Sequence, residues 1–299
     1  MSFSYEAKLE LCKLPVQKLC CARAEAYGIL LYCNTFHSRE VRIITENPEF
    51  AARLPRLFHR AFSLQFDRLP GPEQEGKLIF QIHDEKKLHR IIDLLGYDPN
   101  QNLVLHVNFA MLEEECCRAS FLRGVFLAGG SATDPLKRYH LELATSHLQV
   151  SRELAALLQE CGFVPKSVVR NSYHVTYFKQ SEHIEDFLTL IGAPVAAMAV
   201  MSAKVEKDLR NSINRRLNCD NANLDKAVDA AQEQLEAIRA LTSAGLMAQL
   251  PDKLQQTAAL RLEYPELALS ELAEEFDPPI TKSCLNHRLR KLMSLAQEL

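Results

Sequence analysis

The chain contains two copies of one sequence pattern, and this internal repeat limits the possible folds more than any other feature. Residues 26–34 (AYGILLYCN) align with residues 122–130 (LRGVFLAGG), which places Gly28 on Gly124. The copies are too far apart along the chain for a solenoid, whose repeating units are shorter. We therefore expect one domain in which the two copies are related by pseudo-two-fold symmetry.

Each copy predicts the same order of elements, namely helix, strands, helix, strands and helix. The predicted strands alternate apolar and polar residues, as a sheet with one buried face requires. Each copy ends in a short helical pattern that stops at a glycine, Gly96 or Gly192. The matching segments are strands at 41–45 and 139–144, helices at 48–62 and 148–161, and strands at 77–83 and 173–179.

The opening helix of each copy carries a glycine between bulky apolar residues. Glycine costs about 1 kcal/mol relative to alanine inside a helix, so a single instance would favour an incidental residue. Gly28 and Gly124 occupy equivalent positions in the repeat. We expect these glycines to let the two helix backbones pack closely on the pseudo-two-fold axis.

The composition is that of an ordinary globular protein. The 299 residues are 47% hydrophobic and 24% charged, and the net charge of −3 argues against a protein that coats nucleic acid by bulk charge. The longest apolar stretch, Ile191–Ala203, contains Pro194 and is too short to cross a bilayer. We expect a soluble, cytoplasmic protein that has no membrane partner.

The cysteine pattern favours reduced thiols. No two cysteines have the CxxC spacing typical of a structural zinc site, and the count is odd. The two adjacent pairs stand in apolar, helix-like surroundings, which predicts buried free thiols and no metal site. The nine cysteines are Cys12, Cys20, Cys21, Cys33, Cys116, Cys117, Cys161, Cys219 and Cys284.

Several stretches resemble one protein family. Residues 122–131 (LRGVFLAGGS) resemble the LAGLIDADG motif of homing endonucleases, and the whole chain is similar to the WhiA family of bacterial regulators. That family joins a LAGLIDADG-like domain to a C-terminal helix-turn-helix. Further matching stretches lie at 126–135, 139–142, 214–223 and 277–291, which together cover nearly the full length in family order.

The repeat and the resemblance together predict an α+β fold with four parts. The N-terminal domain is expected to be LAGLIDADG-like, with antiparallel sheets and pseudo-two-fold symmetry. The C-terminal domain is expected to be all-α. The expected limits are an N-terminal arm at 1–19, the LAGLIDADG-like domain at 20–192 with repeats at about 20–96 and 114–192, a helical connector at 193–250 and the helix-turn-helix at 251–299.

The positions that would carry nuclease chemistry are not acidic. In active endonucleases of this kind each motif helix ends in a carboxylate that holds a catalytic divalent metal. The corresponding positions are Cys33 and Gly129, and neither residue is a magnesium ligand. Asp134 and Glu142 lie nearby without matching acids in the first copy. The chain also has no GxSxG, P-loop or HExxH motif, so we expect no catalytic residues, no metal, no cofactor and no enzyme.

Three helices with tight turns are predicted near the C-terminus. Pro251 opens a helix that ends near Tyr264, Ser270 is expected to cap a short helix to Phe276, and Thr281 caps the last one. This arrangement fits a helix-turn-helix, although a plain three-helix bundle would show the same periodicity.

Charge favours recognition of DNA by the last helix. Residues 282–291 contain basic residues and no acid, and Asn and Arg are the residue types that read adenine and guanine edges. The alternative is a solvated basic face. The expected DNA contacts are Lys282, Ser283, Asn286, His287, Arg288, Arg290 and Lys291.

A second basic segment lies in the connector. Residues 210–218 hold three arginines, three asparagines and no acid, although asparagine is a poor helix former. These side chains either contact DNA or cap and brace a bend between domains. The candidate contacts are Arg210, Asn214, Arg215, Arg216 and Asn218.

These features predict a sequence-specific DNA-binding transcription regulator. Its expected partner is double-stranded DNA, which would make it nucleoid-associated, and its LAGLIDADG-like domain could bind a protein partner. The resemblance implies a role in bacterial cell division, chromosome segregation or sporulation. Two alternatives are a protein-interaction scaffold with a vestigial helix-turn-helix and a residual LAGLIDADG endonuclease.

Overall fold

A computed structural model describes residues 2–71, 74, 76–98 and 103–299. The expected N-terminal arm includes Met1, and the expected LAGLIDADG-like domain includes residues 72, 73, 75 and 99–102, all of which lie outside the described residues. The chain forms two compact units, Met1–Asp208 and Leu209–Leu299. None of the described helices is both long and apolar enough to cross a lipid bilayer.

The first half of unit 1 has a three-stranded antiparallel sheet in the order β1-β2-β3. Buried residues alternate along β2 and β3, where Ile43 stands opposite Phe80. Local sequence signals begin α3, because Asn47 accepts hydrogen bonds from the N–H groups of Glu49 and Phe50, and Pro48 follows at the first helical position. The elements are α1 (Phe3–Cys12), α2 (Leu19–Tyr32), β1 (Thr35–His37), β2 (Glu40–Thr45), α3 (Pro48–Phe62), β3 (Leu78–Ile82) and α4 (Glu85–Leu94).

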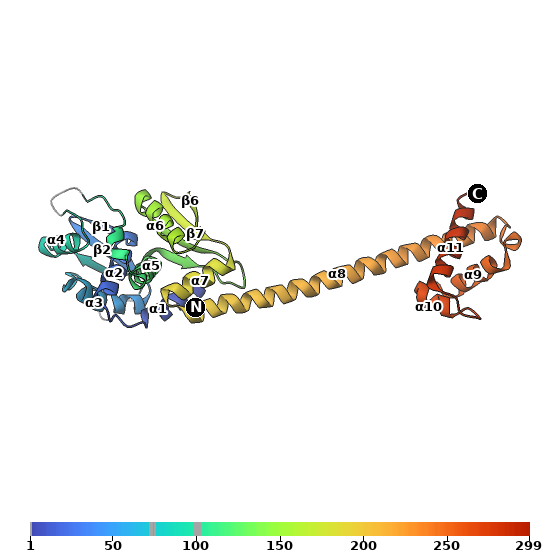
Figure 1. Cartoon of the computed structure of the whole chain (residues 1–299), viewed down its shortest axis with the longest axis horizontal. Coiled ribbons are helices and arrows are strands. Elements are labelled where there is room, and N and C mark those ends of the chain that lie inside the picture. The colour runs from blue at the N-terminus through green and yellow to red at the C-terminus, as the bar shows by residue number, and fades with distance from the viewer. Residues whose placement is uncertain (1, 72–73, 75, 99–102) are drawn as a thin grey trace. The chain divides into compact units, whose positions relative to one another are not determined.

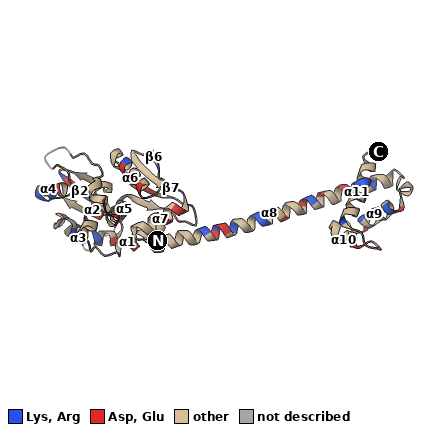
Figure 2. Ribbon diagram, viewed as in Figure 1, with Lys and Arg blue, Asp and Glu red and all other residues tan. Residues whose placement is uncertain are grey.

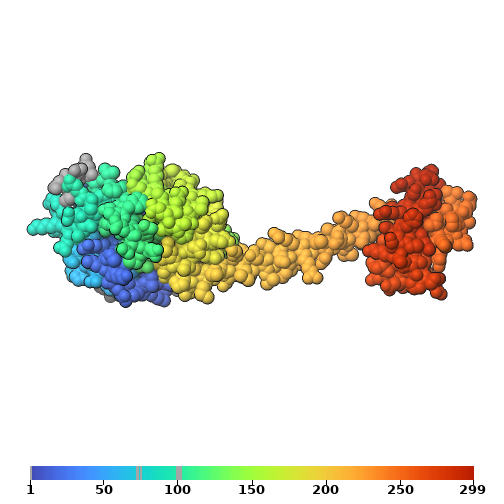
Figure 3. Space-filling view, in the orientation of Figure 1, coloured from blue at the N-terminus to red at the C-terminus, as the bar shows by residue number. Residues whose placement is uncertain are grey.

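The second half repeats this order around a four-stranded antiparallel sheet, β4-β5-β7-β6. Strand β6 was not predicted, because all five of its residues are exposed and their burial does not alternate. The elements are η1 (Phe109–Leu112), α5 (Glu115–Gly129), β4 (Gly130–Ala132), β5 (Leu141–Thr145), α6 (Leu148–Glu160), β6 (Lys166–Arg170), β7 (Tyr173–Phe178) and α7 (Ser181–Ile191). Figure 3 shows the two halves, blue to cyan and green to yellow, packed directly against each other.

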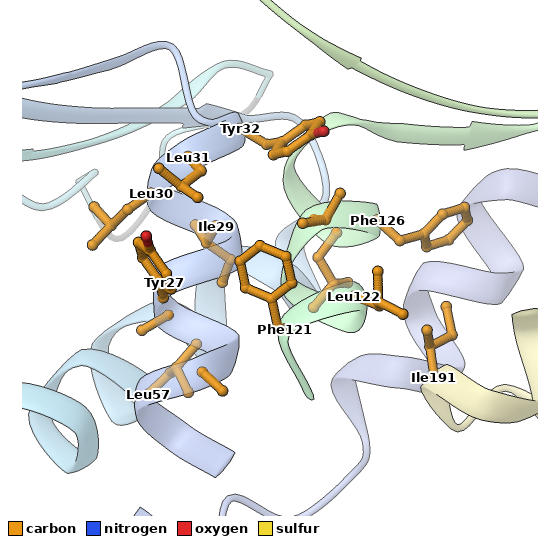
Figure 4. Packing of buried hydrophobic residues seen from close by; sticks show 14 of the residues in the cluster. Tyr27, Ile29, Leu30, Leu31, Tyr32, Leu57, Phe121, Leu122, Phe126 and Ile191 are labelled. Carbon is orange, nitrogen blue, oxygen red and sulfur yellow. The ribbon is translucent and has the colours of Figure 1, made fainter. Parts of the chain in front are cut away.

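Helices α2 and α5 lie side by side at the centre of unit 1 (Figure 1). A Cβ on Gly28 would lie 2.2 Å from the carbonyl oxygen of Phe121, and one on Gly124 would lie 2.1 Å from that of Glu25. Such distances leave no room for a side chain, which confirms the predicted packing role of both glycines. Figure 4 shows the apolar residues around this contact, among them Ile29 and Leu122.

A buried ion pair between Arg53 and Glu25 connects α3 to α2. The guanidinium of Arg53 donates to both carboxylate oxygens of Glu25, at 2.6 and 2.9 Å, and also to the carbonyl oxygens of Cys12 and Leu14. Arg123 on α5 reaches the same carboxylate at 3.2 Å. These contacts satisfy charges that would be costly to bury alone.

Unit 2 is helical. Helix α8 (Pro194–Ser243) contains the boundary between the units, and its end supplies Ile238 and Leu241 to the core of unit 2. It is followed by η2 (Met247–Gln249), α9 (Asp252–Glu263), α10 (Leu269–Glu274) and α11 (Lys282–Ala296). The predicted cap at Ser270 is wrong, because α10 begins at Leu269, and the carboxylate of Glu271 accepts the N–H of Ala268 instead.

Candidate nucleic-acid interface

One apolar stripe fixes the orientation of α11. Leu285, Leu289 and Leu292 are fully buried against α9 and α10, together with Phe276. The hydroxyl of Thr281 accepts the N–H of Cys284 at 3.2 Å, so the helix begins where the sequence predicted. Because the stripe follows helical spacing, the opposite side of α11 must face outward.

The turns around α10 are held by two hydrogen bonds. Arg261 on α9 is buried and donates to the carbonyl oxygen of Leu267 at 2.7 Å, and burial lowers the pKa of this guanidinium. The N–H of Ile280 donates to the carbonyl oxygen of Ala273 at 3.0 Å, which ties the turn before α11 to α10. These bonds hold the segments before α10 and α11 in place.

The outward side of α11 carries most of the predicted contact residues. Figure 2 shows the basic residues of this helix in blue. Asn286 and Arg288 are half-buried, and Arg288 lies over the ring of Phe276, 5.6 Å from its centroid. Arg288 therefore has less freedom to reach a ligand than its neighbours. The exposed residues are Lys282, Ser283, His287, Arg290 and Lys291.

The second basic segment lies in the interior of α8. All of its candidate residues are exposed, and none stands at a helix end, so its asparagines do not act as helix caps. The segment contributes to no described core, since Ile213 and Leu217 between its polar residues are also more than half exposed. The candidate residues are Arg210, Asn214, Arg215, Arg216 and Asn218.

The positions that correspond to nuclease acids lie at the C-terminal ends of α2 and α5. Cys33 is the C-cap of α2, and Gly129 is the last residue of α5. A Cβ on Gly129 would lie 2.6 Å from both the carbonyl oxygen of Ala144 and the Cδ1 atom of Tyr32. This end of α5 therefore has no space for a carboxylate side chain.

Cys33 is equally unsuited to hold a hard cation. Burial raises the pKa of its thiol to about 12, and the sulfur lies 3.2 Å from the carbonyl oxygens of Leu30 and Thr35. The thiol thus keeps its proton and directs it to the backbone. Two lysines, Lys8 and Lys77, line the same pocket of about 390 Å³. Such surroundings disfavour a magnesium ion, which requires oxygen ligands.

The two nearby acids are engaged in local contacts. Glu142 pairs with His140 at 3.1 Å and with Arg170 at 3.4 Å, and Asp134 accepts the N–H of Leu136 at 2.9 Å. Among the described residues, neither acid belongs to a group of three or more His, Cys, Asp or Glu side chains close enough to share an ion.

The cysteine pairs differ from their prediction. Cys117 is buried as expected, but Cys20 is exposed and Cys21 and Cys116 are only partly buried. The fold also brings the two pairs together, and the spacing of cysteines along the sequence did not predict this. The repeat held the signal, because the offset that places Gly28 on Gly124 also places each residue of one pair on a residue of the other.

Two family descriptions match the chain. Residues 118–210 match the WhiA LAGLIDADG-like domain, and residues 213–296 match the WhiA C-terminal HTH domain. A relative from Ruminiclostridium cellulolyticum, named probable cell division protein WhiA, is 35% identical over 100% of this chain and 98% of its own length. The chain belongs to the WhiA family. A relative of the same name from Desulfitobacterium hafniense is 37% identical over 100% of this chain and 96% of its own.

Solved WhiA structures show the same fold. Full-length WhiA from Thermotoga maritima superimposes with a TM-score of 0.62, at 22% identity, and covers 100% of this chain and 99% of that one. The separate N-terminal LAGLIDADG domain of WhiA gives a TM-score of 0.51 at 20% identity, over 64% of this chain and 90% of that one. These comparisons confirm the predicted family and the α+β fold, with an endonuclease-like domain and a helical HTH domain.

Proposed function

We propose that this WhiA-family chain is a sequence-specific DNA-binding transcription regulator in which α11 is the recognition helix. The observation that carries the proposal is the outward side of α11, which is basic from Lys282 to Lys291 and contains no acid in that range. In helix-turn-helix proteins the second helix enters the major groove and places its N-terminal residues at base edges. Lys282, Ser283 and Asn286 occupy those first turns, and Arg290 follows one turn later.

Three of the four parts predicted from the sequence have distinct roles in this proposal. The helix-turn-helix at 251–299 reads the sequence, and the basic segment of α8 adds affinity through phosphate contacts. The endonuclease-like domain neither cleaves DNA nor holds a catalytic metal, because the ends of its motif helices are a protonated thiol and a glycine without space for a side chain. The protein would then be cytoplasmic and nucleoid-associated. The names of its relatives favour a role in cell division.

The test is substitution of Arg290 after DNA sites have been identified by a genome-wide chromatin pull-down. If Arg290 makes a bidentate contact with a guanine, Arg290→Ala loses about 1–3 kcal/mol of specific binding, or about 5- to 150-fold in affinity. Fluorescence anisotropy would measure binding to a selected duplex and to its scrambled counterpart at one salt concentration.

The matched control is Arg239→Ala, which removes an exposed arginine of the same unit that lies outside α11. This variant should retain the ratio of specific to non-specific affinity. Equal losses on both duplexes for Arg290→Ala would make Arg290 a phosphate contact. Full retention of specificity after replacement of Lys282, Asn286 and Arg290 together would refute recognition by α11.

A further inference from the structure

Four cysteine thiols converge at the N-terminal ends of α2 and α5. Cys20 and Cys21 lie in the first turn of α2, and Cys116 and Cys117 lie at the same positions in the first turn of α5. Their four sulfur atoms all lie within 4.8 Å of one another. The pairs are related by the offset that relates Gly28 to Gly124, so the group lies on the pseudo-two-fold axis of unit 1.

We propose that these four thiolates bind a single zinc ion. Tetrahedral zinc has Zn–S bonds of about 2.3 Å, which places its sulfur ligands about 3.8 Å apart. Because no two of these sulfurs are more than 4.8 Å apart, a contraction of at most about 1 Å would give this geometry, and side-chain rotation at the helix termini can supply it. An iron–sulfur cluster would need wider spacing, because its irons and sulfides must fit between the thiolates.

The two helix ends favour the deprotonated thiols that a metal requires. Helix N-termini stabilise thiolates, and neither α2 nor α5 has a side-chain cap to satisfy its first N–H groups.

The exposure of the cysteines and their number indicate a structural zinc site. Cys20 is exposed and Cys117 is buried, so an ion can enter from solvent and then be held against the core. All four ligands come from the protein, which leaves no open position for substrate or water. The ion would join the two central helices at the ends opposite Cys33 and Gly129, far along each helix from the positions that correspond to nuclease acids.

The test uses the full-length protein, purified under reducing conditions without chelators. Elemental analysis should find about one zinc per chain, as a closed four-thiolate site holds. Replacement of zinc by Co²⁺ should give the visible bands of tetrahedral cobalt and a thiolate-to-cobalt charge-transfer band. Zinc removal by a chelator should lower the thermal unfolding temperature, and added zinc should restore it.

The Cys20→Ser/Cys116→Ser variant should lose zinc, the cobalt bands and the effect of the chelator. The matched control is Cys219→Ser/Cys284→Ser, which removes two exposed cysteines outside the cluster and should change none of these. Cys20→Ser alone provides a second variant at an exposed position, and circular dichroism would establish that each variant is folded.

Three results would overturn the proposal. One is folded, reduced wild-type protein that takes up neither Zn²⁺ nor Co²⁺. Another is equal uptake by the cluster variant and the control. The third is an iron–sulfur absorption spectrum.

Discussion

The substitution Gly28→Ala tests whether the contact between α2 and α5 determines the stability of the N-terminal unit. The added Cβ would lie 2.2 Å from the carbonyl oxygen of Phe121 and 2.9 Å from the backbone nitrogen of Val125. Real Cβ atoms essentially never come closer than 3.0 Å to a heavy atom, so the first pair would have to separate by about 0.8 Å. Both obstacles are backbone atoms, which cannot move away as a flexible side chain could.

The gain in helix propensity and the cost of overpacking act in opposite directions, and the larger of the two decides whether Gly28→Ala stabilises or destabilises unit 1. Alanine improves helix propensity by about 1 kcal/mol over glycine. Overpacking in a well-packed core costs about 1–3 kcal/mol and occasionally more, and a backbone-to-backbone clash belongs at the upper end of that range. We therefore expect Gly28→Ala to lower the free energy of unfolding of unit 1 by about 2 kcal/mol or more.

Urea unfolding followed by tyrosine fluorescence would measure this loss, because every tyrosine except Tyr264 lies in unit 1 and the chain has no tryptophan. Gly71→Ala is the matched control, since its added Cβ would meet nothing within 4 Å. That variant should be neutral or slightly more stable. A Gly28→Ala protein as stable as wild type would refute the argument from close packing.

Three further predictions concern the buried ion pair, the basic segment and catalysis. Arg53→Met should cost about 3 kcal/mol of stability in urea unfolding, because it removes the bidentate partner of the buried Glu25 and leaves that carboxylate with the more distant Arg123. Arg42→Met, at a side chain that is 44% exposed, should cost under about 1 kcal/mol, and equal losses would contradict this. Arg215→Ala/Arg216→Ala should reduce the slope of log affinity for DNA against log salt concentration by up to about 1.8, whereas Arg215→Lys/Arg216→Lys should keep that slope. An unchanged slope in the alanine variant would show that this segment does not contact DNA phosphates. Supercoiled plasmid that carries the binding sites should stay intact when it is incubated with excess protein and Mg²⁺ or Mn²⁺. Nicking that disappears on addition of a chelator, and that is lost in Asp134→Ala or Glu142→Ala, would show that the protein is an enzyme.

Sequence periodicity predicted the helices and strands that bury one face and expose the other. Helices α3 and α6 and strands β2, β3, β5 and β7 were predicted to within about two residues, because each buries one face of a regular element. Strand β6 has no buried face, so its sequence carries no alternation. Helix α10 begins before Ser270 because Glu271 caps it from within, which a search for a polar residue ahead of the helix does not detect.

The cysteine group shows where reasoning from spacing fails. Metal sites are found in sequences by ligands a few residues apart, and this group joins residues from the two halves of the repeat. The close approach of α2 and α5 was predicted from Gly28 and Gly124. The same symmetry, extended by two helical turns toward the N-terminus, places Cys20 against Cys116, so the repeat carries the signal for this group and the spacing of the cysteines does not.

The helix pair also explains how a LAGLIDADG-like fold can be stable with Cys33 and Gly129 at the ends of its central helices. Its stability depends on the middle of α2 and α5, where Gly28 and Gly124 allow backbone contact and apolar residues fill the surroundings. At the C-terminal ends, Gly129 lies close to Tyr32, so a glycine there also fits the close packing of the two helices. Two carboxylates at these adjacent helix ends would repel each other and would be unfavourable at a helix C-terminus, and a thiol and a glycine avoid that cost. One end of the helix pair therefore carries a protonated thiol and a glycine, whereas the opposite end brings four sulfur atoms within 4.8 Å of one another.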